Sequence, residues 1–195
     1  KLFVKALAQF TVSLVSANTK YDRVKRKERG VNFTKQEKSG YKLFKTHCAM
    51  CHREPLFTSG TFASNGLPID TFFKDLGRYS ITQIASDSFQ FKIPTLRNSE
   101  FTPPYMHDGR FATLEEVVEF YNSGIRHHPQ LSFMLRKNTN GGFFFMGDDP
   151  QDEYMNQLTG IQPLRMHLSP QDKQDLVAFM KTLTDTDLMV DPKFS

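Results

Sequence analysis

Cysteine, long apolar runs and strand-like alternation of apolar and polar residues are all scarce in this sequence. Its only cysteines are Cys48 and Cys51, so it offers no second cysteine pair. No apolar run is long enough to predict a membrane span. The lack of alternation and of internal repeats favours a mainly helical protein, and 38% apolar residues with 19 phenylalanines can form a substantial core.

The first 17 residues, KLFVKALAQFTVSLVSA, place a lysine ahead of an apolar run, as a signal peptide does. Lys5 and Gln9 interrupt this run, and helical spacing relates Phe3, Leu7, Phe10 and Leu14. This pattern favours a core-facing amphipathic helix over residues 2–17 rather than a targeting segment. Because the chain begins with lysine, we expect a preceding segment to have been removed or to lie outside it.

The basic residues exceed the acidic ones by 25 to 21, and many of them lie in KYDRVKRKER, residues 20–29. No interleaved aromatic residues and no groove-reading motif accompany this run, so no nucleic-acid partner is expected. We interpret residues 20–29 as a solvated linker.

Three helices are predicted from their N-terminal signals, which are Thr34 with Glu37, Thr113 with Glu116, and Ser169 with Pro170. The first should run into Cys48, and Gly124 should cap the end of the second. Residues 55–101 show little periodicity and are expected to form loops and short helical turns. The predicted apolar faces contain Tyr41, Phe44, Leu114, Val117, Val118, Tyr121, Leu176, Phe179, Met180 and Leu183.

The motif KTHCAMCHRE carries the strongest chemical signal. Two cysteines three positions apart near a helix end project to the same side, so both thiols can add to the vinyl groups of one haem. His52 would then bind the haem iron as the proximal ligand. A zinc half-site would need two further ligands with their own spacing, and a redox pair would be expected in a βαβ unit that this sequence lacks. The motif therefore predicts covalently bound haem c.

Several stretches in order extend this signal, namely GYKLFKTHCAMCH, PLFTSGTFASNGL, DLGRY and FKIPTLRNSEFTPPYMHDGRFATLEEVVEFYNSG. Together they resemble the C-terminal haem domain of the bacterial di-haem cytochrome c peroxidases, a family that includes the MauG-like oxidases. The resemblance runs from residue 1 to about 121 and resumes over residues 168–185. It implies an all-α c-type cytochrome fold with loop-rich segments wrapping the haem.

The resemblance also implies a domain plan. Residues 1–32 would be an interdomain helix and basic linker, residues 33–185 the haem domain with a loop excursion at 126–165, and residues 186–195 a tail. Members of the family carry a second haem domain whose haem reacts with peroxide, and that domain is not part of this chain. The expected partners are therefore a second haem domain, hydrogen peroxide as oxidant, and a small redox protein or protein substrate as electron donor.

Three functions remain open from the sequence. The first is the electron-relay half of a di-haem peroxidase or MauG-like oxidase. The second is a mono-haem electron-transfer cytochrome c with histidine and methionine ligands, and the third is a structural haem protein in a larger redox assembly. Because covalent attachment of haem needs an export-side assembly apparatus, a periplasmic location is expected.

The distal haem ligand has two main candidates. In MauG-like members a tyrosine occupies the position that matches Tyr121, where the family's peroxidases have a methionine. A phenolate stabilises ferric and higher states, whereas a thioether favours ferrous iron. Met106 is the rival ligand, Met166 a weaker one, and Tyr121 as an ordinary core residue is the alternative. Met134, Met146, Met155, Met180 and Met189 are expected to be packing or loop residues.

Other positions are suggested by the resemblance alone. The carbonyls of Thr102 and Pro104 match positions that bind calcium between the two haem domains, although TPP can also be an ordinary turn. Arg97 and Arg78 are candidates for pairing with the haem propionates. His107, next to Asp108, is interpreted as a residue that orders the turn at the haem edge rather than as an acid–base catalyst.

Overall fold

The computed structural model describes residues 1–69, 74–137 and 162–194. Its α-helices are α1 (Leu2–Ser13), α2 (Lys20–Lys25), α3 (Lys35–His47), α4 (Tyr79–Thr82), α5 (Leu114–Glu119), α7 (Pro170–Lys181) and α8 (Thr186–Met189). Short 3-10 turns are η1 (Ala85–Asp87), η2 (Ser99–Phe101) and η4 (Phe133–Leu135), and η3 (Phe120–Gly124) is a π-helical turn. The prediction of a mainly helical fold is confirmed.

Strands are short and few in the described part of the chain. β1 (Phe62–Ala63) pairs antiparallel with β2 (Phe91–Lys92), with Phe62 opposite Lys92. β3 (Arg136–Lys137) pairs antiparallel with β4 (Gln162–Pro163), with Arg136 opposite Pro163. Apart from β1 and β2, the described residues between 55 and 101 form loops and short helical turns, as predicted. Of the predicted excursion at 126–165, residues 138–161 lie outside the described residues.

All three predicted helix starts are confirmed as reciprocal capping boxes. The hydroxyls of Thr34, Thr113 and Ser169 each accept a hydrogen bond from the backbone N–H three residues on, and the acidic side chain there accepts one in return. These bonds satisfy amide groups that would otherwise have no partner at the first turn. The helix that leads into Cys48 therefore begins and ends where the sequence predicts.

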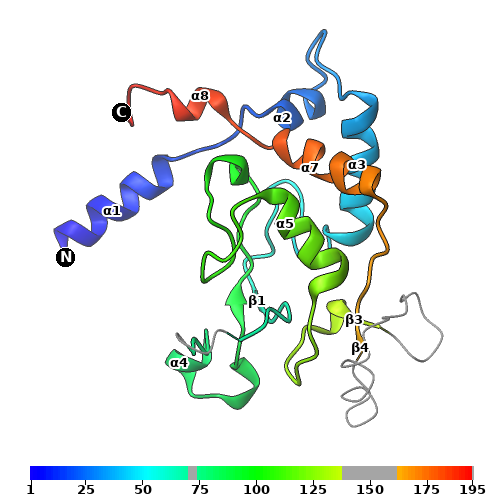
Figure 1. Ribbon diagram of the computed structural model, residues 1–195. Coiled ribbons are helices and arrows are strands. Elements are labelled where there is room, and N and C mark those ends of the chain that lie inside the picture. The colour runs from blue at the N-terminus through cyan, green and yellow to red at the C-terminus, as the bar shows by residue number, and fades with distance from the viewer. Residues whose placement is uncertain (70–73, 138–161, 195) are drawn as a thin grey trace.

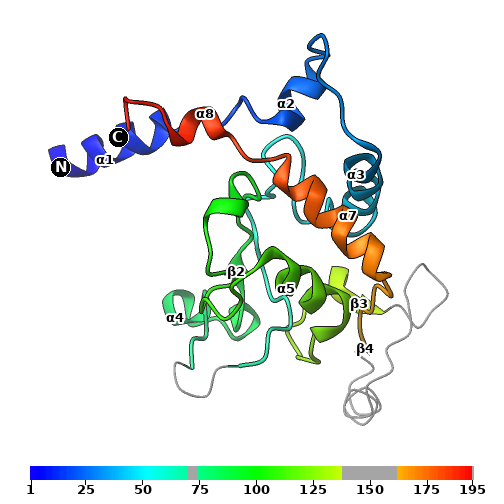
Figure 2. The ribbon, with the colours of Figure 1, turned by 45° about the horizontal axis from the view of Figure 1, so that its top comes forward.

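Helices α3 and α7 lie side by side and form the main core (Figures 1 and 2). They approach so closely at Gly40 that a Cβ there would lie 1.9 Å from the backbone oxygen of Asp175. The core between them is largely aromatic, and Phe44, Phe57 and Phe179 are at most 1% exposed. A smaller apolar cluster lies under α5 and η3, formed by Phe120, Ile125, Leu131, Leu135, Leu164 and Met166.

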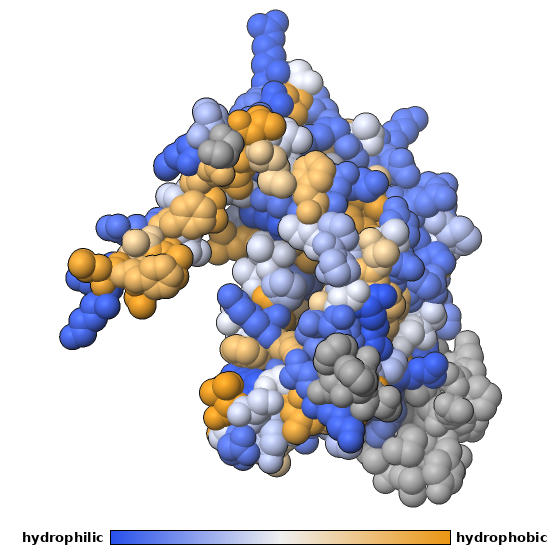
Figure 3. All heavy atoms as spheres, turned by 60° about the vertical axis from the view of Figure 1, so that its left-hand side comes forward, coloured by the Kyte–Doolittle hydropathy of each residue, from blue (hydrophilic) through white to orange (hydrophobic). Residues whose placement is uncertain are grey.

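Helix α1 does not face the core, so that prediction is wrong. It projects from the rest of the chain, with its apolar side chains exposed (Figures 1 and 3), and none of its residues is buried. Leu2 and Val12 are 84% and 78% exposed, and the ring of Phe10 meets that of Phe194. Helical spacing correctly predicted an apolar stripe, but periodicity does not specify what covers it. The helix is also shorter than predicted, ending at Ser13 rather than residue 17.

The basic segment is not a solvated linker throughout. Lys20–Lys25 forms α2, which begins with a capping box between Thr19 and Asp22. Tyr21 anchors the helix in the main core and is 3% exposed. The aromatic ring of Tyr21 and the cap together hold this segment on the protein, while its lysine and arginine side chains remain at the surface.

The end of the helix over residues 114–124 also differs from the prediction. The α-helical part stops at Glu119, and η3 continues through Gly124 to a fully buried Ile125. Gly124 is therefore the last residue of the π turn rather than a left-handed cap. No helix within the described residues is both long and apolar enough to span a bilayer.

Candidate functional site

Cys48, Cys51 and His52 lie together at the C-terminal end of α3. Cys48 caps the helix through a 2.8 Å bond from its N–H to the carbonyl of Phe44. The backbone N–H groups of Cys51 and His52 then donate to the carbonyl of Cys48, at 3.1 and 2.9 Å. This turn gathers two free thiols and one imidazole at a single helix end, as the motif predicts.

The two thiols do not have the environment of a redox pair. Burial raises the pKa of Cys48 to about 12 and also raises that of Cys51. Reactive redox cysteines instead have lowered pKa values, because nearby positive charge stabilises the thiolate. Within the described residues, no group of three or more His, Cys, Asp or Glu side chains could hold a metal ion. The raised pKa values of both thiols therefore disfavour the redox interpretation of the motif.

The imidazole of His52 is held in one orientation by two backbone carbonyls. Its Nδ1 lies 3.1 Å from the oxygen of Phe57 and 3.1 Å from that of Pro94. A proton on Nδ1 can be donated to these oxygens, which leaves Nε2 with its lone pair available to bind a metal. Burial lowers the pKa of His52, so the neutral form needed for metal binding is favoured.

A cleft of about 460 Å³ opens beside Cys51. This volume lies within the range of cofactor pockets. Met134 lines the cleft with its sulfur 3.5 Å from Cys51 Sγ, and Arg53 and Arg136 supply positive charge to its walls. Met134 was expected only to pack or to lie in a loop, and the sequence gives no signal for its contact with Cys51.

Tyr121 and Met106 converge on one side chain, Asn65. The Asn65 amide nitrogen lies 3.4 Å from the hydroxyl of Tyr121 and 3.6 Å from the sulfur of Met106. Burial raises the pKa of Tyr121 to about 12, and the thiols of Cys51 and Cys48 are close enough to add to this effect. Tyr121 is therefore a buried phenol whose hydroxyl is paired with Asn65, and its role as a distal ligand stays a prediction.

Two features around Tyr121 are not predicted by the sequence, namely the contacts of Asn65 and the π turn. Asn65 belongs to the stretch PLFTSGTFASNGL, which carries part of the resemblance, but nothing in its sequence pattern marks it as a contact of both ligand candidates. Tyr121 lies in the π turn η3, and such turns are frequent at functional sites. The weaker candidate, Met166, is 6% exposed within the smaller apolar cluster.

The two arginines assigned to haem propionates have protein partners. Arg97 donates to both carboxylate oxygens of Asp22, at 2.8 and 2.7 Å, and to the carbonyl of Pro55 at 3.0 and 2.8 Å. Arg97 therefore links α2 to the loop that follows the cysteine motif. Arg78 pairs with Asp87 at 3.0 Å and lies over the ring of Phe62. The propionate roles of both stay predictions.

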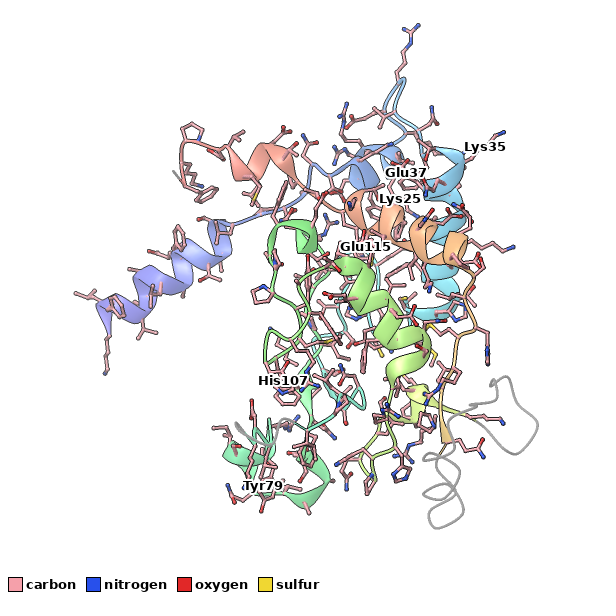
Figure 4. The ribbon with its side chains drawn as sticks, viewed as in Figure 1. Lys25, Lys35, Glu37, Tyr79, His107 and Glu115 are labelled. Carbon is pink, nitrogen blue, oxygen red and sulfur yellow. The ribbon has the colours of Figure 1, made fainter. Side chains whose placement is uncertain are left out.

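His107 lies on the loop side of the molecule, away from α3 and α7 (Figure 4). Its ring stacks on that of Phe91, with centroids 3.7 Å apart. Its neighbour Asp108 is engaged by Arg110 at 2.8 Å, and although burial opposes ionisation, this guanidinium holds the pKa of Asp108 below its usual range. The arrangement agrees with a residue that orders a turn.

Thr102 and Pro104 lie in an exposed segment directly after η2. The peptide bond between Pro103 and Pro104 is cis. The assignment of calcium to the carbonyls of Thr102 and Pro104 stays a prediction.

No model of a protein family matches the chain, but individual proteins do. MauG of Methylorubrum extorquens is 31% identical over 182 residues, which are 91% of this chain and 42% of MauG. Cytochrome c551 peroxidase of Nitrosomonas europaea is 38% identical over 117 residues, covering 58% of this chain and 35% of the peroxidase.

Solved structures agree with these relatives. A MauG-like protein associated with microbial copper homeostasis superposes with a TM-score of 0.65 at 31% identity, over 92% of this chain and 52% of that protein. The diheme peroxidase BthA of Burkholderia thailandensis gives a TM-score of 0.57 at 26% identity, over 86% of this chain and 46% of BthA. The chain thus spans about half the length of these relatives, or less.

Proposed function

This chain is homologous over most of its length to the di-haem cytochrome c peroxidases and MauG, which are oxidoreductases, and we propose that it is the electron-relay haem c domain of such an enzyme. The domain would act with a second haem domain outside this chain. Hydrogen peroxide is the proposed oxidant, a small redox protein or protein substrate the proposed electron donor, and the periplasm the proposed location.

One observation carries this proposal, namely the arrangement of the cysteine motif at the end of α3. Cys48 and Cys51 would hold haem through thioether bonds, and His52 would bind its iron through Nε2, because Nδ1 faces the carbonyls of Phe57 and Pro94. When bound, haem supplies an iron that can exchange single electrons. The chain's contribution is to orient the imidazole and to surround the cofactor with protein.

We propose Tyr121 as the distal ligand. A tyrosine phenol is neutral near pH 7, and burial raises the pKa of Tyr121 further, so its ionisation would need a positive metal ion against the oxygen. The Asn65 amide, 3.4 Å away, could then donate to the phenolate. Such a ligand stabilises ferric and higher states, which suits retention of oxidising equivalents.

The alternative function is a mono-haem electron carrier with His52 and Met106 as ligands. It is supported by the 3.6 Å contact between Met106 and Asn65, which puts the thioether beside the same amide as the phenol. Calcium held by the carbonyls of Thr102 and Pro104, with a further ligand from the second haem domain, would favour the two-domain function instead.

The decisive experiment is the ratio of haem to protein combined with the native mass of the purified assembly. We expect one covalent haem on this chain and two haems in the active assembly. A stable single-haem unit that exchanges electrons without a second haem domain would support the carrier. A chain of unmodified mass with no Soret absorption would refute both functions.

A further inference from the structure

Two tyrosines share one carboxylate oxygen at the outer end of the main core, and the proposed haem chemistry does not use either of them. The hydroxyl of Tyr21 donates to Glu54 Oε2 at 2.6 Å, and that of Tyr41 donates to the same oxygen at 3.0 Å. Lys25 Nζ donates to the Tyr41 hydroxyl at 2.6 Å and lies 3.3 Å from Glu54. Lys25 extends from α2 toward α3 (Figure 4).

Phe57 connects this cluster to the proposed iron ligand. Its carbonyl oxygen lies 3.1 Å from His52 Nδ1, and its ring meets that of Tyr21 edge to face with centroids 4.8 Å apart. Phe57 and Tyr21 are 0% and 3% exposed, so the contact between their rings is shielded from solvent. Since electron transfer falls off steeply with distance, a hydrogen bond followed by a direct ring contact makes Tyr21 a favourable donor to the haem.

Tyr21 is better suited to lose an electron than Tyr41. The ammonium groups of Lys25 and Lys45 each lie 4.8 Å from the centre of the Tyr41 ring, and their positive charge opposes oxidation of that ring. Over the Tyr21 ring, Lys25 lies farther away, at 5.3 Å from the ring centre, and Arg97 is the second cation near this tyrosine. Its phenolic proton also has a carboxylate acceptor within direct transfer distance.

We propose that Tyr21 is a redox-active tyrosine that would supply one electron to the haem iron once hydrogen peroxide or another strong oxidant has raised that iron above the ferric state, while the proton of Tyr21 moves to Glu54. The O–H bond of Tyr21 breaks and an O–H bond forms on Glu54 Oε2. The electron would return the haem iron to the ferric state, and Tyr21 would become a neutral radical. An electron from an external donor reduces the radical, and the proton returns from Glu54. The inference rests on the proposed haem at Cys48 and Cys51, and it gives oxidising equivalents a route to the α2 and α3 surface.

The test uses the haem-loaded full chain oxidised by photogenerated tris(bipyridine)ruthenium(III), which does not depend on any reaction with peroxide. Samples are frozen immediately and examined by electron paramagnetic resonance. We expect an organic radical whose signal narrows when ring-deuterated tyrosine is incorporated. The signal should fall at least fivefold in Tyr21→Phe and less than twofold in the matched variant Tyr41→Phe. Glu54→Gln, which preserves shape but removes the proton acceptor, should reduce it as Tyr21→Phe does.

A tyrosyl signal of undiminished size in Tyr21→Phe would overturn the inference, as would the absence of any tyrosyl signal from the haem-loaded chain. If Tyr21→Phe fails to fold, an undiminished tyrosyl signal in Glu54→Gln would overturn the inference instead. A separate sample receives hydrogen peroxide without ruthenium. A haem spectrum unchanged by peroxide counts against the peroxidase role, while the photochemical result still decides the role of Tyr21. A chain without Soret absorption refutes both.

Discussion

The two sides of the candidate site are built in different ways. On the side of His52, α3 is a regular helix of 13 residues with a reciprocal cap, and it packs along α7. On the side of Tyr121, α5 has only 6 residues and continues as a π turn, and the neighbouring Asn65 and Met106 come from loops. Local sequence rules therefore specify the first side, whereas the second depends on contacts between distant segments.

The largest expected effect, a loss of bound haem, comes from substitutions on the side of His52, where α3 is a regular helix. Replacing Cys48 or Cys51 by alanine should remove most of the covalently bound haem, and His52→Ala should remove the proximal bond, because all three side chains act on one cofactor. Intact mass and Soret absorption measure these changes, with the exposed Lys42→Ala as control. If both cysteine variants kept the full mass of covalently bound haem, the assignment of Cys48 and Cys51 as the attachment residues would be wrong.

Gly40→Ala should be the most destabilising small substitution in the α3–α7 contact. The added Cβ would meet the Asp175 backbone oxygen at 1.9 Å, so the two helices would have to move apart. Overpacking of this kind costs about 3 kcal/mol. Urea unfolding of Gly40→Ala and the control Lys42→Ala measures the difference. Equal unfolding midpoints would mean that the close approach does not contribute to stability.

On the side of Tyr121, the variants Tyr121→Phe and Met106→Leu test which side chain is the distal ligand. If Tyr121 is the distal ligand, its loss should change the ferric spectrum and raise the haem midpoint potential by on the order of 0.1 V, since axial ligands tune potentials over ~0.8 V. Met106→Leu is the matched control and should change either quantity much less. The reverse pattern would make Met106 the ligand and favour the electron carrier.

The smallest expected effect concerns the ion pair between Asp22 and Arg97, which attaches α2 to the loop after the cysteine motif. Although burial favours the neutral acid, hydrogen bonds from Arg97 and Thr19 hold the pKa of Asp22 below its usual range. A lowered pKa in the folded state contributes stability above about pH 4, and this is lost as the pH falls through the folded value.

In Asp22→Asn, the acid-dependent loss of unfolding free energy should therefore shrink by on the order of 1 kcal/mol. Denaturant titrations between about pH 6 and pH 2 measure it, spanning both the usual and the lowered pKa of this carboxyl. The control is Asp75→Asn, at an exposed position. An identical pH profile in the wild type and Asp22→Asn would show that the Arg97 pair does not stabilise the fold.

Sequence reasoning succeeded where the relevant signal is local. The three capping boxes were predictable because a cap involves residues only three positions apart, and the thiols and imidazole of the haem motif lie within one turn. It failed for α1, whose apolar stripe exists but is covered among the described residues by little beyond the ring of Phe194. It also failed for α2, because the charges around Tyr21 obscured a single buried ring.

The sequence by itself determined the chemistry at the end of α3, since the spacing of Cys48, Cys51 and His52 specifies their geometry once a helix forms. Tertiary structure alone decided that Asn65 touches both Tyr121 and Met106, that Arg97 is occupied by Asp22, and that Phe57 joins His52 to Tyr21. The physical reason is separation along the chain. A contact within one helical turn follows from backbone geometry, whereas a contact across many residues depends on how the whole core packs.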